Sequence, residues 1–444
     1  MNVLLIAYNY PPDPIVGSLR AAKVADALRS AGHRVEVVTA RLPSERGRSR
    51  VREDSYGVHA VRCLPHPRGL YTWWLRRRNR GAGGAGNGAV QVQKAPAGSS
   101  GSGSRSRLRS ALRWLGAFFW VPDQMFGFVL PAALRSLWLC RQGIDLVYTT
   151  SPPHSTHLVG LIIKSLIGIP WVMELRDPWR EAPNQLVAGN RAARALNRWL
   201  ERRCLHAADR IVAVSDGIAE IVAERTGGNG VRPPIVARNG IDELLSEPLE
   251  PEPGAAFRIV YLGSLYLNRD PMPFLRALAV VRTRLGLGAD DLSVEFIGAC
   301  ETYRGMSVPA AIQDLGIADV ARVRPPIPHA EARAAMLRAD LLLLLAQGQP
   351  AQVPNKLYEY LGARRPILAI ADEDGETARI LREVGGHYVV TDVADGSLEE
   401  ALERAIRRVP LPPPSEEVLA ALTTERQMEA LMRELGVAPA GAAR

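Results

Sequence analysis

Apolar and polar positions follow one another in blocks along the chain, and the blocks predict strands and helices in turn. In the first half, the pattern predicts buried strands at 3–7, 35–39, 145–150, 171–175 and 210–215, with helices around 18–31, 156–166 and 191–206 between them. Gly32 directly follows the first of these helices and is its expected C-cap, and Gly168 marks the turn after the second. A strand, a helix and a short glycine turn therefore repeat through this half.

The second half restarts the same pattern. Strands are predicted at 258–264, 341–345 and 367–370 and over the runs SVEFIG, ARVRP and HYVV, with helices between them and a last helix around 416–435. Such alternation is typical of parallel, doubly wound sheets. We expect an α/β protein with two Rossmann-like domains, joined near 237–254, where the run EPLEPEPG marks a linker.

Composition agrees with a two-domain globular protein. A chain of 444 residues is long enough for two domains with full cores, and its content of 47% apolar and 23% charged residues is ordinary for a globular protein. Four cysteines are scattered without a C-x-x-C pair, which favours a reducing compartment and argues against zinc: Cys63, Cys140, Cys204 and Cys300. The start MNVLLIAYNYPPDP lacks the basic region of a signal peptide, so we expect a cytoplasmic protein.

The positive charge is concentrated in one segment. Between Arg76 and Arg113 lie nine basic residues and no acidic one, which equals the formal excess of +9 for the whole chain. Within it, the Gly/Ser/Ala-rich stretch 81–104 is predicted to be disordered, so an insertion of about 76–109 in the first domain is expected. Its flanks are aromatic as well as basic, as in LYTWWLRRRNR.

Three interpretations of this segment stay open. The first is a solvated linker. The second is a docking element, either for an anionic membrane or for a lipid-linked acceptor, and the third is a contact with nucleic acid. No helix-turn-helix, zinc-finger or RNA-recognition pattern accompanies it, so no nucleic-acid partner is expected. Pro122 and Asp123 interrupt the apolar run 114–130, which argues against a transmembrane helix.

The run VPNKLYEYLGARRPILAI (353–370) carries the clearest chemistry. A Pro-Asn pair opens a helix that places Lys356 and Glu359 near its start, beyond the carboxyl end of the predicted strand 341–345. Open α/β sheets bind nucleotides at that edge. A carboxylate there accepts both hydroxyls of a ribose, and the ammonium neutralises phosphate or orders the loop. The alternative is a surface helix with ordinary charges.

This segment resembles the donor-binding signature of retaining GT-B glycosyltransferases of family 4, especially bacterial members with a P-x-K-x-x-E-Y form. The family usually has a Glu-x7-Glu pair, and its second glutamate, which holds the ribose, corresponds to Glu359. The first, which touches the donor sugar, is replaced by Ala351. Sugar recognition is therefore expected from the backbone and side chains of Gln347 to Gln352, and the donor sugar stays open.

A second run, YLGSLYLNRDP, resembles the G-R-L-x-x-x-K-G loop of the family. Gly263 matches the glycine, Ser264 stands where arginine is frequent, and Arg269 takes the place of the lysine. The resemblance implies a cation that holds the donor diphosphate and stabilises the leaving charge; a plain surface arginine is the alternative. With Lys356, two cations are available, and we expect neither a metal nor a cofactor.

Loops of the first half carry the remaining candidates. Gly17 and Ser18 open a helix whose free N–H groups favour an anion, and the family's Gly-rich loop at this place approaches the donor. Asp13 and Arg20 are candidate acceptor contacts. The run DLVYTTSPPHSTHLVG, with the later RDPW, resembles bacterial family-4 sequences and supplies three further candidates: His154, Arg176 and Asp177.

Each of these has an ordinary explanation too. The family often has histidine where Arg176 stands, so the role of that histidine cannot be carried over, and Arg176 is a candidate acceptor contact. Asp177 matches the following acid of the family or only caps a helix. His154 is a ligand or a hydrogen-bonded structural histidine. The turn VARNGID (236–242) matches the family's N-G-V-D turn and is interpreted first as a domain-joining element.

The resemblance implies a GT-B architecture with an interdomain cleft: an acceptor-side domain at 1–240, a nucleotide-sugar domain at 241–424, and a terminal helix at 425–444 that returns to the first domain. It implies a retaining transferase that moves a sugar from a nucleotide-diphosphate sugar to a saccharide, with catalytic candidates Asp177, Arg269 and His154. A lipid-linked acceptor at the inner face of the plasma membrane, for surface polysaccharide, is favoured. A soluble small-molecule acceptor and a catalytically silent binding scaffold are the alternatives.

Overall fold

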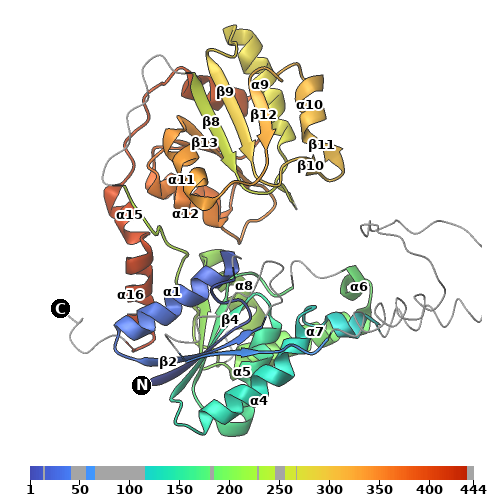
Figure 1. Ribbon diagram of the computed structural model, residues 1–444, viewed down its shortest axis with the longest axis vertical. Helices are drawn as coiled ribbons and strands as arrows, with labels where there is room; N and C mark the ends of the chain where they lie inside the picture. Colours follow the sequence, from blue (N-terminus) through green and yellow to red (C-terminus); the bar gives the residue numbers. More distant parts are fainter. Residues whose placement is uncertain are drawn as a thin grey trace, which may run out of the picture. The chain divides into compact units, whose positions relative to one another are not determined.

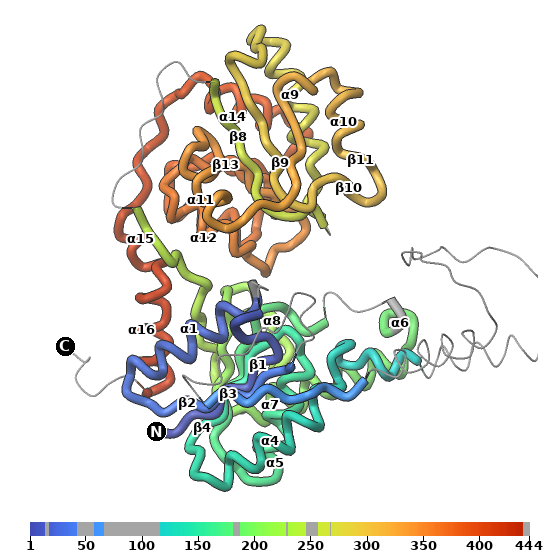
Figure 2. Tube along the Cα trace, in the orientation of Figure 1, coloured from blue at the N-terminus to red at the C-terminus, as the bar shows by residue number. Residues whose placement is uncertain are grey.

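The computed structural model describes residues 1–13, 16–41, 57–65, 116–180, 185–227, 230–245, 256–266 and 268–437. The chain forms two compact units (Figures 1 and 2). The first unit comprises Met1–Val212, Ile221–Ile235 and Leu435–Arg444, and the second comprises Ala213–Glu220 and Val236–Glu434. The predicted basic insertion and the EPLEPEPG linker lie outside the described residues.

The first unit is built on a seven-stranded sheet with the order β3-β2-β1-β4-β5-β6-β7. Its strands are β1 (Asn2–Ala7), β2 (Arg34–Ala40), β3 (Val58–Val61), β4 (Leu146–Ser151), β5 (Trp171–Leu175), β6 (Arg210–Ala213) and β7 (Ile235–Val236). Strand β1 lies between β2 and β4 and pairs in parallel with both, so that Val3 lies opposite Val35 on one side and Leu146 on the other. All six residues of β4 are buried, as expected for a parallel strand covered on both faces.

Helices connect these strands. They are α1 (Val16–Ser30), α4 (Val129–Cys140), α5 (Ser155–Ile167), α6 (Gln185–Ala188), α7 (Arg191–Ala207) and α8 (Asp216–Thr226), with short turns η1 (Ala117–Trp120) and η2 (Phe126–Phe128). The segment Ala213–Glu220, which includes the start of α8, belongs to the second unit. The glycine cap predicted at Gly32 is confirmed by its φ of 85°. Gly168, with φ of 83°, caps α5 in the same way. Asn190 caps α7 by accepting from the backbone N–H groups of Ala192 and Ala193.

The second unit has a six-stranded parallel sheet with the order β12-β9-β8-β13-β14-β15. Its strands are β8 (Phe257–Leu262), β9 (Leu292–Ile297), β12 (Ala321–Arg324), β13 (Leu341–Ala346), β14 (Ile367–Ala371) and β15 (Tyr388–Val390), and the antiparallel pair β10 (Thr302–Tyr303) and β11 (Met306–Ser307) stands apart. The predicted pair of doubly wound, Rossmann-like sheets is therefore confirmed.

Helices of the second unit pack on both faces of its sheet, where two apolar clusters of buried side chains form the core. The helices are α9 (Met272–Leu285), α10 (Val308–Asp314), α11 (His329–Arg338), α12 (Asn355–Gly362), α13 (Glu376–Val384), α14 (Ser397–Ile406), α15 (Glu416–Ala421) and α16 (Thr424–Glu434). Within the part of the chain that the structure describes, no helix is both long and apolar enough to cross a membrane.

The structure departs from the sequence prediction at two places. The single helix predicted around 416–435 is two helices, because the backbone N–H of Ile241 donates to the oxygen of Leu422 and Ile241 bridges Thr423. The strand predicted at 210–215 ends at Ala213, and the next residues lead into α8. Beyond α16 the chain rejoins the first unit, where the oxygen of Val437 lies 2.6 Å from Nε2 of His33. The return of the helix itself stays a prediction.

Candidate functional site

In the second unit, the loop after β8 is shaped by two glycines. Gly263 has φ of 147°, a conformation that side chains rarely adopt. A Cβ on Gly298, which follows β9, would lie 1.8 Å from the oxygen of Gly263, so only glycine fits there. The Sγ of Cys300 donates to that same oxygen, and Ser264 is exposed. The loop therefore presents backbone and the exposed Ser264 at the carboxyl edge of the sheet, and the donor-binding roles of Gly263 and Ser264 stay predictions.

Arg269 lies further along this loop. Its guanidinium stacks over the ring of Tyr266, 4.3 Å from the centroid, and its Nε is buried without a hydrogen-bond partner among the described residues. Stacking holds the planar group in place. Arg269 thus places a cation at this edge of the sheet, and its contact with a diphosphate stays a prediction.

The loop 347–352, after β13, is tied down on several sides. The carboxylate of Asp372 accepts from the backbone N–H groups of Gly348 and Gln349, both at 2.8 Å. Asn268 donates to the oxygen of Gly348, and Nε2 of Gln347 donates to the oxygen of Asp270. These bonds join the loop after β13 to the loop after β8, so the two predicted donor loops form one assembly.

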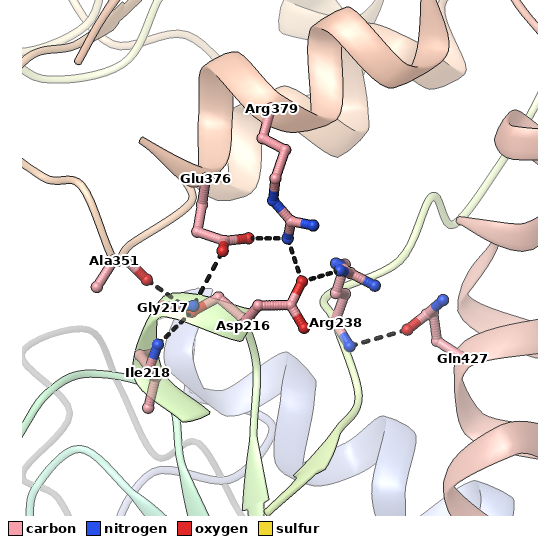
Figure 3. A network of polar contacts seen from close by, with 9 residues as sticks. Asp216, Gly217, Ile218, Arg238, Ala351, Glu376, Arg379 and Gln427 are labelled. Carbon is pink, nitrogen blue, oxygen red and sulfur yellow. Dashed lines mark hydrogen bonds and ion pairs between the residues drawn. The ribbon is translucent and has the colours of Figure 1, made fainter. Parts of the chain in front are cut away.

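Figure 3 shows how the same loop is fixed at the start of α8. The hydroxyl of Ser215 donates to the oxygen of Ala351 at 2.6 Å, and the N–H of Gly217 donates to Glu376 at 2.9 Å. A Cβ on Gly217 would lie 2.8 Å from Cα of Ala351, so glycine permits this close approach. Ala351, where the family has its first glutamate, is thus held by its backbone.

Two arginines complete this network. Asp216 accepts from both Arg238 and Arg379, and Arg379 also binds Glu376 at 2.7 Å (Figure 3). Glu376 is nearly buried, and its charge is balanced by Arg379 and by the start of α8. Gln427 of α16 accepts from the backbone of Arg238. The sequence analysis missed this network because it assigned Ser215 to a strand.

Helix α12 carries the two charged candidates Lys356 and Glu359. They are about one quarter exposed and form an ion pair of 2.6 Å, while Asn355 donates to the other carboxylate oxygen of Glu359 at 3.3 Å. Each carboxylate oxygen has two lone pairs, so both oxygens keep capacity for a ligand hydroxyl. The pair holds the carboxylate in position. Both predicted roles of Lys356, ordering the loop and neutralising phosphate, stay predictions.

A buried tyrosine connects α12 to β8. Tyr360 is fully buried, and its hydroxyl accepts from the backbone N–H of Leu262, the residue before Gly263, at 2.9 Å. The helix with Glu359 and the glycine loop are therefore fixed relative to each other. Sequence reasoning missed Tyr360, because a tyrosine on an apolar helix face gives no sign of a partner 98 residues away.

The turn VARNGID (236–242) packs against the start of α16 in the second unit. A Cβ on Gly240 would lie 2.3 Å from Cα of Thr424, and the Thr424 hydroxyl donates to Asp242. A Cβ on Gly362, at the end of α12, would meet the oxygen of Glu243 at 2.4 Å. The turn thus secures α12 and α16 within the second unit, and its predicted role in joining the two domains stays a prediction.

In the first unit, Arg176 binds backbone oxygens at the carboxyl edge of the sheet. Its Nη1 donates to Gly17 at 2.6 Å, its Nε to Ser151, and its Nη2 to Pro152 at 3.3 Å. The guanidinium therefore joins the start of α1 to the loop after β4. Three of its donors are used inside the unit, so its predicted contact with an acceptor is limited to the remaining N–H groups.

Arg20 is buried, with 4% of its surface exposed. It donates two hydrogen bonds to one oxygen of Glu174, at 3.0 and 2.9 Å, and Thr150 donates to the other. Burial alone would raise the pKa of Glu174, but Arg20 and the hydroxyl outweigh it and hold the pKa below its usual value. Arg20 is placed to fix Glu174, and its predicted acceptor contact has no support from its position.

His154 lies over Trp179, with ring centroids 4.8 Å apart and an angle of 15°. Burial lowers the pKa of His154 to about 4, so it is neutral at pH 7. Its neighbour His157 is fully buried with Nδ1 2.8 Å from the Thr149 hydroxyl. A neutral imidazole can exchange a proton with a ligand but supplies no positive charge.

Gly17, Asp13 and Asp177 surround the same edge. Gly17 lies in the first turn of α1, and the Ser18 hydroxyl donates to the oxygen of Asp13 at 2.7 Å. Asp13 therefore stands before the helix start where an anion was expected, and its charge competes with one. Asp177 is half-buried beside Arg176. The structure brings these first-unit candidates to one edge of one sheet, and their roles stay predictions.

Comparison with known proteins assigns the family. Residues 18–237 match the family described as "Glycosyl transferase 4-like domain". The chain belongs to glycosyltransferase family 4. The match begins in α1 and ends after β7, so it covers most of the first unit of this family-4 protein.

Two curated relatives of the family-4 chain are similar over part of their length. The D-inositol 3-phosphate glycosyltransferase of Paenarthrobacter aurescens is 24% identical over 198 residues, which are 42% of this chain and 47% of that protein. The alpha-maltose-1-phosphate synthase of Mycolicibacterium smegmatis is 28% identical over 256 residues, which are 54% and 60%. The chain thus spans about half to three fifths of the length of these relatives.

Solved structures share the fold over nearly the whole chain. Anabaena HepE in complex with UDP has a TM-score of 0.58 at 12% identity, covering 98% of this chain and 100% of that one. Sucrose-phosphate synthase from Thermosynechococcus elongatus has a TM-score of 0.57 at 14% identity, covering 98% and 99%. At such identity the likeness shows the fold alone, and it confirms the predicted GT-B fold of this family-4 chain.

Proposed function

We propose that this family-4 chain is a retaining glycosyltransferase that moves a sugar from a nucleotide-diphosphate sugar to an acceptor hydroxyl. The observation that carries the proposal is the single assembly of donor loops in the second unit. There, the glycine loop at Gly263, the stacked Arg269 and the paired Lys356 and Glu359 lie on elements tied together by Tyr360 and the loop 347–352. HepE, which has this fold, was solved with UDP.

The proposed chemistry needs no protein nucleophile. The bond between the sugar carbon and the diphosphate oxygen breaks, the acceptor oxygen bonds to that carbon on the same face, and the leaving diphosphate takes the acceptor proton. Arg269 and Lys356 stabilise the charge that grows on the diphosphate, where fixed cations are most effective. Gly263 and Ser264 bring backbone to the phosphates, and Glu359 accepts the ribose hydroxyls.

The first unit is proposed to hold the acceptor. His154, which is neutral at pH 7, and Asp177 are assigned to hydrogen bonds that orient the reacting hydroxyl while the diphosphate takes its proton. Arg176 fixes Gly17 by a hydrogen bond to its oxygen, and the remaining N–H groups of Arg176 and the carboxylate of Asp13 are assigned to the acceptor. Arg20 acts through Glu174 beneath this edge.

Donor-sugar recognition is proposed to rest on amides of the loop 347–352. Among the described residues, Oε1 of Gln347 and Nε2 of Gln349 are buried and have no hydrogen-bond partner. Buried polar atoms of this kind normally find partners, and sugar hydroxyls both donate and accept. The loop bonds from Asp372 hold these amides in place where the family's first glutamate is absent.

For the acceptor, we favour a lipid-linked saccharide of surface polysaccharide synthesis, because of the basic and aromatic run around 76–113. The names of the two relatives support a second candidate, since both refer to a phosphorylated small molecule. A soluble acceptor is therefore the main alternative, and a silent binding scaffold is the other.

Binding and turnover of nucleotides test the proposal. A thermal-shift screen over nucleoside diphosphates should raise the melting temperature with one base, because a ligand of the native state stabilises it. The matching nucleotide sugar should then be consumed in the presence of acceptor, with little effect of EDTA. No shift with any nucleoside diphosphate would overturn the proposal, and binding without turnover would favour the scaffold.

The basic run offers a test of the lipid-linked acceptor. Replacing Arg76, Arg77, Arg78, Arg105, Arg107 and Arg109 with Ser should abolish the salt-sensitive part of the recruitment to anionic vesicles at low salt, whereas deleting 81–104, which carries only Lys94, should change it little. Equal flotation of the six-fold variant and the parent, with unchanged transfer to a lipid-linked acceptor, would support the solvated linker.

A further inference from the structure

Helix α4 of the first unit exposes an apolar stripe. Leu130, Leu134 and Trp138 are 56%, 61% and 47% exposed, and their spacing of four residues places them on one line along the helix. Surface helices normally turn such a line toward the core and show polar residues outside. The core-facing side of α4 is also apolar, so this helix is apolar on both sides.

Two neighbouring helices continue this surface. Helix α5 packs against both α4 and α7, and Figures 1 and 2 show α4 and α5 on the side of the sheet opposite α1. At the end of α5, Leu166 and Ile167 are 69% and 45% exposed, and α7 exposes Trp199 to 57%. All three helices run antiparallel to the strands of the sheet. Their carboxyl-terminal ends therefore lie toward the amino edge of the sheet, away from His154 and Arg176.

The charge on this surface is positive. No acidic residue occurs between Asp123 and Asp145, and Arg135 stacks on Trp138 at 4.3 Å. On α7, the exposed side carries several arginines around Trp199: Arg194, Arg198, Arg202 and Arg203. The acid within α7, Glu201, is 2% exposed and bonded to Arg180 and Arg225. Apolar and aromatic side chains thus lie among cations without an exposed acid on α4 or α7.

We propose that this surface of α4, α5 and α7, the three-helix surface, docks on an anionic lipid leaflet. Leucines and tryptophans partition into the headgroup and acyl boundary, and arginines pair with anionic headgroups. A second copy of the chain is a poorer occupant, because a symmetric interface would place the arginines of α7 against an equally positive surface. The proposal does not depend on the donor chemistry, so either can fail alone.

Sedimentation with vesicles tests it on the full chain. We expect the parent to bind vesicles of phosphatidylcholine with 30% phosphatidylglycerol at 0.5 M NaCl, where attraction by exposed charges is largely screened. The variant Leu130→Ser, Leu134→Ser, Trp138→Ser should lose at least tenfold in partition coefficient. The matched control Val280→Ser, on an exposed valine of the second unit, should bind as the parent does.

Replacing the arginines of α7 measures the electrostatic contribution to vesicle binding. Arg198→Gln, Arg202→Gln, Arg203→Gln should weaken binding at 0.1 M NaCl and reduce its dependence on salt, while leaving nucleotide binding unchanged. Equal partition of the parent and the apolar variant would overturn the proposal. So would a dimer in sedimentation velocity that the apolar substitutions dissociate, since the surface would then belong to a second copy.

A conservative variant guards against misfolding. Brominated lipid should quench part of the tryptophan fluorescence of vesicle-bound parent, and Trp138→Phe, which keeps an apolar ring, should lose a distinct part of this quenching. If quenching is the same in the parent and in Trp138→Phe, the side chain does not reach the acyl region and the proposal fails.

Discussion

The candidate groups of the two units are held in opposite ways. In the second unit, Lys356 and Glu359 are about one quarter exposed and bind each other. In the first unit, Arg20 and Glu174 are almost fully buried, and Arg176 is committed to backbone oxygens. Exposed pairs contribute little to folding, whereas a buried pair that loses one member leaves a costly charge. Substitutions in the second unit should therefore change ligand binding, and those in the first should change stability.

The largest effect is expected at Glu174. Glu174→Ala leaves Arg20 buried without its partner and should lower the free energy of unfolding by about 3–5 kcal/mol in urea denaturation. Affinity for a nucleoside diphosphate should not change. The pKa of Glu174 is lowered in the native protein, so its contribution is present at neutral pH and is lost as the pH falls through the native pKa.

Two variants bracket this result. Glu224→Ala removes an exposed carboxylate of the same unit and should cost about 0.5 kcal/mol or less. The double variant Arg20→Met, Glu174→Leu removes both charges and should recover most of the loss. If Glu174→Ala is as stable as Glu224→Ala, the contrast between the units is wrong.

Arg269 should show the reverse behaviour. Arg269→Ala should lower turnover about 100-fold, or about 3 kcal/mol, because the leaving charge exists mainly in the transition state. Stability should change by less than about 1 kcal/mol. Steady-state kinetics and urea denaturation measure both, with exposed Arg276→Ala as the control. A loss in donor affinity that accounts for the whole effect would assign Arg269 to binding alone.

Glu359 should affect binding of the nucleotide. Glu359→Ala removes an acceptor of two ribose hydroxyls and should weaken the affinity by about 2 kcal/mol, or about 30-fold, with the fold intact. Titration calorimetry with the nucleoside diphosphate measures it, and Glu331→Ala, an exposed carboxylate on α11, is the control. Unchanged affinity would remove Glu359 from the donor site.

The last effect is a pH dependence in the first unit. The pKa of His154 falls from 6.5 to about 4 on folding because the ring is buried, so between these values the unfolded chain binds a proton that the native chain does not. Stability should fall as the pH drops from 6.5 to 4, and His154→Phe should reduce this fall by about 2–3 kcal/mol. Urea denaturation at both pH values tests it, and exposed His206→Asn should behave as the parent.

Local signals predicted the elements well. Gly32 and Gly168 follow apolar helices and take the left-handed conformation, and the run of leucines at 341–345 is a buried parallel strand. Where a residue distant in the sequence determines the end of an element, the sequence pattern did not predict that end. The helix predicted at 416–435 breaks because Ile241 binds Leu422, and nothing near 422 in the chain indicates that contact.

The candidate site shows the same limit. Glu359, Lys356, Gly263 and Arg269 were found because family-like spacing marks them, and the structure ties their elements together. The sequence pattern did not predict the residues whose hydrogen bonds connect these elements: Tyr360, Asp372, Ser215 and Glu376. Their partners are 23 to 159 residues away, and each is an ordinary polar residue until the fold brings it to a backbone group.

The proposed recognition of the donor sugar by the loop 347–352 implies a limit on how donor choice evolves in this chain, because the loop is attached at several places. Its anchors belong to α8, α13 and the end of β14, which are separate segments of the gene. A recombination event that exchanged only the loop with a relative would leave Ser215, Gly217 and Asp372 shaped for the old one. New sugar preferences are therefore expected to arise by point substitution inside the loop, or by exchange of the entire second unit.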